Sequence, residues 1–410
     1  MRGNERGQAQ LPDLEVWGVV TEVVRVAPKV VGVELKFSMR IASTKSICEI
    51  YAESEHEKVV LWSDPTCGYR GIIAIHSTAL GPAVGGTRFW DYGCDKVASL
   101  DALRLSRGMS YKNALAGLPF GGGKAVIIGN SRTGSREEIF RAHGKFVESL
   151  GGAFITAEDV GTTPADMVLV RQETRHVAGL PDKSGDPSPM TALGVFQAML
   201  ACAKYRWGSA TLNGIKVAIQ GCGNTGYHLA RELYNAGAEL IVCDVNEERA
   251  RRVANEFEAR TVPPQEIFGV DVDVFAPCAL GGVINDITIP QLKVEIIVGS
   301  ANNQLLEDSH GAALAELNIL YAPDCVANSG GVINGCRELL GWEQSETMQR
   351  IVGIYDRMLA LLNLAEDQGL PPHKTADRLA RELIAGKANK QMDGHGAVAQ
   401  LSRRALRSVY

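Results

Sequence analysis

The sequence lacks the features of a membrane protein, a disulfide-rich protein or a nucleic-acid-binding protein. Its 410 residues contain no run of about eighteen apolar residues, so we expect no membrane-spanning helix and no membrane partner. The nine cysteines include no CxxC pair, which favours scattered free thiols in a reducing cytoplasm. A net charge of −5 gives no general reason to expect nucleic acid as a partner. The eight histidines form no HExxH motif and no tight cluster with carboxylates, so no metal site is predicted.

The two ends of the chain differ from its middle. Residues 1–45 are valine-rich but interrupted by charges, and they contain no secretory cleavage signal. They are either an added pair of strands or sequence upstream of a true start at Met39. Residues 386–410 are basic and glycine-spotted, as expected of a frayed tail. The length between these ends suggests two or three domains.

The first half of the chain alternates between predicted strands and helices. Strands are expected over Lys58–Trp62 and Gly71–His76, separated by a turn-rich connection. Helices are expected over Lys96–Lys112 and Glu137–Leu150. A short strand then ends in the adjacent acids Glu158 and Asp159, where side chains commonly face a cleft. Asp159 could instead cap the next helix, although Thr162 or Thr163 suits that role better.

Two glycine-rich stretches mark places where a ligand could approach the backbone. Gly81-Pro-Ala-Val-Gly-Gly-Thr-Arg88 is expected to form a loop, or simply a tight turn between strands. In Leu118-Pro-Phe-Gly-Gly-Gly-Lys-Ala-Val-Ile-Ile-Gly129, three glycines run into Lys124, and an apolar strand follows. An ATP-binding P-loop requires glycine where Leu118 stands and serine or threonine where Ala125 stands, so this stretch does not match one.

Lys124 is a candidate general base. Apolar neighbours on both sides favour its burial, and Lys112 lies twelve residues earlier. Burial and a second cation both disfavour a charged ammonium, so we expect them to lower the pKa of Lys124. Each lysine also has a structural explanation. Lys124 could be a surface lysine after a glycine loop, and Lys112 could simply complement the dipole at the end of a helix.

The second half contains a complete dinucleotide-binding pattern. A buried strand over Gly214–Gln220 leads into Gly221-Cys-Gly-Asn-Thr-Gly226, a helix follows, and the next strand ends at Asp244. The glycines allow the backbone to approach a pyrophosphate at the helix N-terminus. Asp244 can accept hydrogen bonds from ribose hydroxyls and would repel a 2′-phosphate, which favours NAD over NADP.

Further strand and loop units follow the dinucleotide pattern. Three more strands are expected, each leading into a loop at the carboxyl edge of a parallel sheet. Asn303 and Asn328 lie in these loops and can offer amides to a ligand, although asparagine is also an ordinary turn residue. Asp186–Pro189 is expected to be the crossover between the domains. A long helix over Glu346–Asp367 and a last amphipathic helix complete the pattern.

Seven ordered motifs resemble one enzyme family. From about Lys58 to Ala385 the chain resembles the glutamate/leucine/phenylalanine/valine dehydrogenases, most closely the leucine and valine branch. The motifs are Gly81-Pro-Ala-Val-Gly-Gly-Thr-Arg88, Arg107-Gly-Met-Ser-Tyr-Lys-Asn113, Gly121-Gly-Gly-Lys124, Thr156-Ala-Glu-Asp-Val-Gly161, Ala276-Pro-Cys-Ala-Leu-Gly281, Ala301-Asn-Asn-Gln304 and Asn328-Ser-Gly-Gly-Val-Ile-Asn334. The resemblance implies an α/β fold with two domains and a cleft, comprising an N-terminal domain with a mixed sheet and a Rossmann-type NAD-binding domain.

The resemblance also implies roles for individual residues. Lys112 holds the substrate carboxylate, Lys124 is catalytic, and Asp159 assists proton transfer. The implied substrate-binding residues are Gly86, Met109, Lys112, Asn303, Val332 and Gly335. The implied cofactor-binding residues are Thr191, Gly221, Cys222, Gly223, Asn224, Thr225, Gly226, Tyr227, Asp244, Ala276, Pro277, Cys278, Asn303 and Asn328.

The implied domain organisation is discontinuous. The substrate domain takes residues 46–185 and about 340–385, because the family's C-terminal helices return to it, and the Rossmann domain takes residues 186–339. The implied reaction is NAD-dependent oxidative deamination of an L-amino acid to a 2-oxo acid and ammonia, in a homo-oligomer.

The resemblance also implies that five uncharged residues lie around the substrate side chain, which argues against glutamate as the substrate. These positions are Val84, Ala157, Ala178, Val332 and Gly335. Branched-chain substrates are favoured by Thr156–Gly161, whereas the small residues Ala178 and Gly335 enlarge the pocket and keep phenylalanine or tryptophan as an alternative. A catalytically idle NAD-binding sensor is a more distant alternative, because Lys112, Lys124 and Asp159 are all present.

Overall fold

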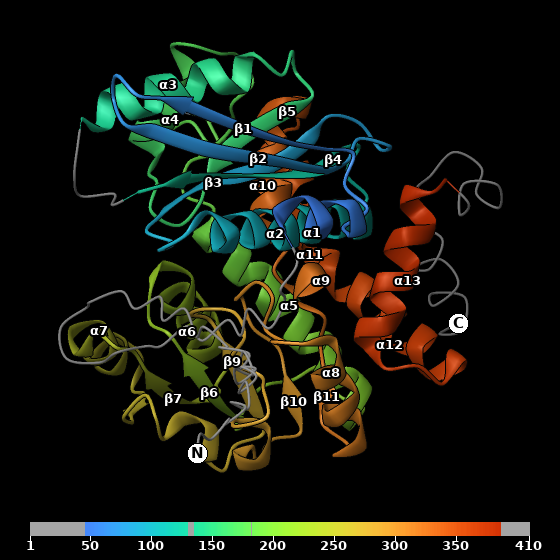
Figure 1. Cartoon of the computed structure of the whole chain (residues 1–410). Helices are drawn as coiled ribbons and strands as arrows, with labels where there is room; N and C mark the ends of the chain where they lie inside the picture. Colours follow the sequence, from blue (N-terminus) through green and yellow to red (C-terminus); the bar gives the residue numbers. More distant parts are fainter. Residues whose placement is uncertain (1–45, 130–134, 182, 387–410) are drawn as a thin grey trace, which may run out of the picture. The chain divides into compact units, whose positions relative to one another are not determined.

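The chain folds around two separate β-sheets (Figure 1). The structure, a computed structural model, describes residues 46–129, 135–181 and 183–386. The expected extension over residues 1–45 and the expected tail, apart from residue 386, lie outside these described residues. One sheet is mixed and the other is parallel, so the predicted α/β class with a mixed-sheet domain and a Rossmann-type domain is confirmed.

The mixed sheet has five strands in the order β1-β2-β4-β3-β5. They are β1 Lys58–Asp64, β2 Tyr69–Ser77, β3 Ala83–Trp90, β4 Gly121–Ile128 and β5 Phe154–Glu158. β1 and β4 run antiparallel to β2, while β3 runs parallel to both β4 and β5. The expected strands over Lys58–Trp62 and Gly71–His76 are confirmed as β1 and β2.

Helices cover both faces of the mixed sheet. α2 packs on β2 and β4, while α3 and α4 lie on the other face (Figure 1). The helices of this part are α1 Ile47–Glu53, α2 Asp95–Leu115, α3 Arg136–Glu148 and α4 Pro164–Arg171. Because both faces are covered, β2 is buried along almost its whole length. α2 and α3 confirm the two predicted helices.

The glycine-rich stretches form strands, and the expected loops are wrong. Residues 83–88 belong to β3, and Gly121–Gly123 belong to β4. Glycine is required here because neighbouring backbone lies too close for a side chain. A Cβ on Gly85 would lie 1.8 Å from the carbonyl oxygen of Gly123, and one on Gly122 would lie 2.0 Å from the backbone nitrogen of Ser110. These glycines let the strands pack tightly against each other and against α2.

The parallel sheet has six strands in the order β11-β10-β9-β6-β7-β8. They are β6 Lys216–Gln220, β7 Glu239–Cys243, β8 Arg260–Thr261, β9 Val274–Pro277, β10 Ile296–Ile297 and β11 Leu320–Tyr321. The elements between them are α6 Asn224–Asn235, α7 Glu247–Phe257, η1 Ile267–Gly269, η2 Ile289–Gln291 and α8 Asp308–Glu316. The predicted order of strand, glycine turn, helix, strand and acid is present as β6, α6, β7 and Asp244.

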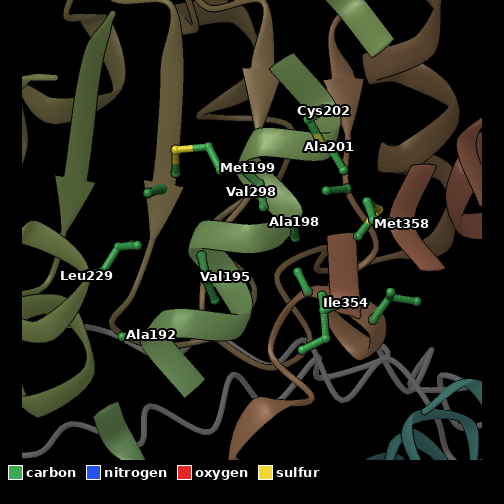
Figure 2. Packing of buried hydrophobic residues seen from close by; sticks show 14 of the residues in the cluster. Ala192, Val195, Ala198, Met199, Ala201, Cys202, Leu229, Val298, Ile354 and Met358 are labelled. Atoms are coloured by element: carbon green, nitrogen blue, oxygen red, sulfur yellow. The ribbon is translucent and has the colours of Figure 1, made fainter. Parts of the chain in front are cut away.

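α5 Ser188–Trp207 is the helix around which the larger core assembles. Its small buried residues Ala192, Ala198 and Ala201 allow neighbours to approach closely, and Leu229 of α6 packs on one side (Figure 2). Ile354 of a C-terminal helix packs against the same core. α5 begins within the predicted crossover Asp186–Pro189, since Pro187 is its N-cap residue and Ser188 and Pro189 belong to its first turn.

Two helical corrections concern the C-terminal part. The stretch expected to be a loop after β11 contains α9 Asp324–Ala327 and the start of α10 Gly330–Leu340. The expected single helix over Glu346–Asp367 is two helices, α11 Gln344–Val352 and α12 Ile354–Gln368, which meet at Gly353. Glycine is a poor helix former, and Gly353 with ψ −2 departs from α-helical geometry.

The last helices contact both parts of the fold. α12 packs on α5, whereas α13 Pro372–Ile384 packs on α2 and α12. The contact of α13 with α2 accords with a return of the chain to the first domain. The boundaries at residues 185, 340 and 385 remain a prediction.

Candidate functional site

Lys124 lies in β4 and is almost completely buried, with 4% of its surface exposed. Its Nζ is 2.9 Å from Oδ2 of Asp159. Burial lowers the pKa of Lys124, the carboxylate of Asp159 opposes that effect, and the guanidinium of Arg88 adds to it. The net result is a pKa below the ordinary value for lysine. The surface lysine that the sequence left open is therefore excluded.

Asp159 follows the last residue of β5, and one of its carboxylate oxygens forms ion pairs with two cationic side chains. Lys124 Nζ lies 2.9 Å and Arg88 Nε 3.0 Å from its Oδ2. Burial alone raises the pKa of this carboxyl, but Lys124 and Arg88 outweigh it and hold the pKa well below the usual range. Asp159 does not cap α4, because Thr163 accepts the hydrogen bond from Asp166 N in a capping box. Its carboxylate is thus directed to the lysine.

Lys112 lies in the last turn of α2 and contacts the second domain. Its Nζ donates a hydrogen bond of 2.8 Å to Oδ1 of Asn302, which also accepts one from Nδ2 of Asn328 at 2.9 Å. Burial lowers the pKa of Lys112, and the carboxylate of Asp324 is the strongest opposing influence. Lys112 therefore does more than complement the helix dipole, because it joins α2 to the loops after β10 and α9.

Asp324 was not predicted as a site residue, yet it organises these loops. Its Oδ2 accepts a hydrogen bond from the backbone N–H of Asn303, and its Oδ1 accepts one from Cys325 N at 3.0 Å. Asn303 has φ +51, in the left-handed region that asparagine tolerates better than most residues. Asp324 thus fixes the backbone of Asn303 through a hydrogen bond. Its negative charge also opposes the lowering of the Lys112 pKa by burial. No short motif signalled it.

The other expected substrate residues lie in β3, α2 and α10. Gly86 in β3 lies beside the acid, since a Cβ there would be 2.8 Å from Asp159 Cβ. Met109 in α2 is half-buried, one turn before Lys112. Val332 and Gly335 both lie in α10, and a Cβ on Gly335 would meet nothing within 4 Å. The enlarged pocket at Gly335 remains a prediction.

Three further pocket positions are also uncharged in the fold. Val84 and Ala178 are buried, at 5% and 2% exposure, and Ala157 in β5 is half-buried. Gly86 pairs with Ala157 in the register of β3 and β5, which places this group near Asp159. The placement of Val332 and Gly335 beside the substrate remains a prediction.

The predicted pyrophosphate turn has the geometry that its glycines imply. Gly221 has φ +102, and a Cβ on Gly226 would lie 1.9 Å from the carbonyl oxygen of Gly221. A Cβ on Gly223 would meet nothing within 4 Å, so space beside the backbone is free at this position. No side chain caps α6, whose first turn contains Asn224, Thr225 and Tyr227. Its N–H groups remain available to a phosphate.

The remaining expected cofactor residues gather around this turn or in the adjacent loops. Cys222 N donates to Asp244 Oδ2 at 2.7 Å, so part of the carboxylate braces the turn. Ala276 and Pro277 end β9, and Cys278 follows it and donates its backbone N–H to the carbonyl of Gln220. Thr191 lies in the first turn of α5, where its hydroxyl donates to the carbonyl of Pro187. Asn328 has a buried Oδ1 that no described residue contacts by a hydrogen bond. These features fit a dinucleotide.

A cavity of about 160 Å³ lies next to this site. It is formed by α2, α13 and the loops after β10 and β11, and it includes Asn303 and Asp324 but neither Lys124 nor Asp159.

Among the described residues, no group of three or more histidines, cysteines and carboxylates could hold a metal ion. In the same part of the chain, no helix combines the length and apolarity needed to cross a membrane.

The chain matches two family models along most of its described length. Residues 56–176 match the Glu/Leu/Phe/Val dehydrogenase dimerisation domain. Residues 242–391 match Glutamate/Leucine/Phenylalanine/Valine dehydrogenase. These matches include Lys112, Lys124 and Asp159 in the first region and Asn303 in the second.

Individual proteins of known activity are similar over nearly their full length. A leucine dehydrogenase of Geobacillus stearothermophilus is 52% identical over 80% of this chain and 91% of its own. An L-tryptophan dehydrogenase of Nostoc punctiforme is 47% identical over 82% and 95%. The crystal structure of L-tryptophan dehydrogenase from Nostoc punctiforme has a TM-score of 0.71 at 43% identity, and covers 85% of this chain and 100% of that one.

Proposed function

Because the chain belongs to the glutamate/leucine/phenylalanine/valine dehydrogenase family and is an amino-acid dehydrogenase, we propose that it oxidises branched-chain L-amino acids with NAD. The products are the 2-oxo acid and ammonia, and the reaction is reversible. The observation that carries this proposal is the contact of buried Lys124 with half-buried Asp159, whose Nζ and Oδ2 are 2.9 Å apart. A lysine with a lowered pKa, hydrogen-bonded to a carboxylate, is suited to general-base catalysis.

Lys112, Lys124 and Asp159 have separate roles in the proposed reaction. Lys112 binds the substrate carboxylate, for which it exchanges its contact with Asn302. NAD held at the Gly221–Gly226 turn would supply the hydride acceptor for the substrate Cα, and loss of that hydride would leave an iminium carbon on the substrate. Neutral Lys124 takes a proton from the water that adds to this carbon, and Asp159 then passes protons to the departing ammonia. Burial of both lysines excludes bulk water from these transfers.

NAD is favoured over NADP by Asp244. Its carboxylate stands at the end of β7, where it braces the glycine turn through Cys222 N. A negative charge at this position repels a 2′-phosphate and accepts hydrogen bonds from ribose hydroxyls. The free space at Gly223 and the uncapped start of α6 support binding of the pyrophosphate. Asn328 and Asn303 are the amides proposed to face the nicotinamide.

The branched-chain substrate is supported by uncharged pocket positions and by the similarity to leucine dehydrogenases. An aromatic substrate is the second candidate, because Gly335 faces open space and an L-tryptophan dehydrogenase is 47% identical. One methylene changes discrimination between substrates by only about 1–3 kcal/mol, so overlapping activities are expected.

A homo-oligomer is also proposed, since residues 56–176 match a family model described as a dimerisation domain. The nine free cysteines accord with the expected cytoplasm.

One assay tests activity, substrate and cofactor together. Formation of NADH is followed by absorbance at alkaline pH with leucine, valine, phenylalanine and tryptophan, and each substrate is repeated with NADP. We expect the highest kcat/KM with leucine or valine and NAD. A preference for phenylalanine or tryptophan would transfer the proposal to the aromatic alternative. Binding of NAD without turnover of any amino acid would instead favour the inactive sensor.

A further inference from the structure

We propose that Arg88 is a positioning residue, which aligns Asp159 with Lys124 and keeps the proton off Lys124 in the resting enzyme. The inference rests on the proposed function. Arg88 is the last residue of the Gly81–Arg88 motif, and no role is predicted for it from the sequence. Its Nε lies 3.0 Å from the same carboxylate oxygen that Lys124 Nζ approaches to 2.9 Å. Two cations therefore compete for one oxygen of Asp159.

Arg88 is held in this position from its other side. Its Nη1 donates to Asp101 Oδ2 at 2.8 Å, and Tyr92 OH donates to the same oxygen at 2.8 Å. Only 20% of the Arg88 and Asp101 side chains is exposed. Asp101 lies in α2 and Arg88 in β3, so this chain of contacts joins the helix of Lys112 to the strand beside Lys124. The guanidinium is thus a fixed charge.

A fixed cation at this oxygen affects both partners of the pair in one direction. It disfavours a proton on Lys124, and it also disfavours a proton on Asp159. Asp101 acts in the opposite direction on Lys124, because its charge raises that pKa. The other charged groups facing the pair are Lys112 from α2 and Glu158, the neighbour of Asp159. Arg88 contacts the pair directly, through Nε at 3.0 Å from Asp159 Oδ2.

The effect of Arg88 is large enough to measure. At an effective dielectric constant of about 20, two unit charges roughly 5 Å apart change each other's pKa by about two units. Half of that change would move the midpoint of a titration by about one pH unit. The acid side of the kcat/KM profile for amino-acid oxidation reports when Lys124 becomes neutral. Loss of the Arg88 charge should therefore move this side to higher pH.

The experiment compares kcat/KM against pH for the full chain and three variants. Arg88→Gln should move the acid side of the profile to higher pH by about one unit. Arg88→Lys keeps the charge, so the acid side of its profile should lie close to that of the wild type. Arg70→Gln is the matched control, since Arg70 pairs with Asp95 at a site where both side chains are 56% exposed. Its profile should match the wild type. An Arg88→Gln profile that falls in height without moving would reduce Arg88 to a structural brace and overturn the proposal.

A second variant keeps the test decisive if Arg88→Gln does not fold. Asp101→Asn removes a charge that favours protonated Lys124, so its acid side should move to lower pH. A profile that stays in place or moves upward would contradict the proposed electrostatics. The proposed function fails separately: in that case wild type forms no NADH with any amino acid, whatever the variants do.

Discussion

Replacing Gly335 with valine tests the substrate pocket, because this position combines a helical backbone with free space. Gly335 lies within α10, and a Cβ there would meet nothing within 4 Å. Valine should therefore be accommodated without a clash in the free enzyme. If the substrate side chain fills this space, the added methyl groups should exclude an aromatic ring more strongly than a branched aliphatic chain. Discrimination of about 1–3 kcal/mol corresponds to roughly 10- to 200-fold in kcat/KM.

The assay measures NADH formation with leucine and with tryptophan for wild type and Gly335→Val. We expect kcat/KM for tryptophan to fall at least about tenfold relative to that for leucine. Ala315→Val is the control, because Ala315 is an exposed position on α8. Its ratio should equal that of wild type. Equal losses for both substrates, or no change in their ratio, would refute the placement of Gly335 beside the substrate side chain.

Three further predictions concern the cofactor, stability and Lys112. Gly223→Ala should raise the KM for NAD about tenfold or more, because its Cβ would occupy space reserved for the pyrophosphate; Gly269→Ala, equally unobstructed, should leave it unchanged. Burial lowers the pKa of His143 from 6.5 to about 3, so the unfolded state binds the proton first. Urea unfolding should therefore show stability falling from pH 6.5 toward pH 3, by up to about 1.4 kcal/mol per pH unit, and His143→Gln should lose that slope. Asp324→Asn should raise the KM for the amino acid about tenfold or more, since it removes the carboxylate that opposes the lowering of the Lys112 pKa by burial; an unchanged KM would contradict this.

Periodicity and local motifs predict the elements of this fold well. Apolar spacing gives α2 and α3, and the ordered glycine turn gives the parallel sheet and its first helix. Glycine misleads where its role is close packing. At Gly85 and Gly122 the sequence suggests flexibility, yet the residues lie in strands whose neighbours leave no room for a Cβ. That requirement depends on contacts between distant segments, which composition does not reveal.

The sequence likewise predicts only part of the site, because several of its contacts join segments that are distant in the sequence. Lys124 and Asp159 follow from motifs, and the structure brings them within 2.9 Å. Lys112 was expected as the cation that lowers the pKa of Lys124, but Arg88 acts on it more strongly. Arg88 and Asp159 are 71 residues apart and meet across neighbouring strands. Asp324 likewise acts through backbone N–H groups, which carry no sequence signature.

The most direct test of the account replaces the amine of Lys124. Lys124→Ala is compared with Lys145→Ala, which removes an exposed lysine of α3, for amino-acid turnover and for binding of NADH by fluorescence. The account predicts that Lys124→Ala binds NADH like wild type while its turnover falls at least about 100-fold at every pH, and that Lys145→Ala changes neither. Turnover by Lys124→Ala near the wild-type rate would contradict it.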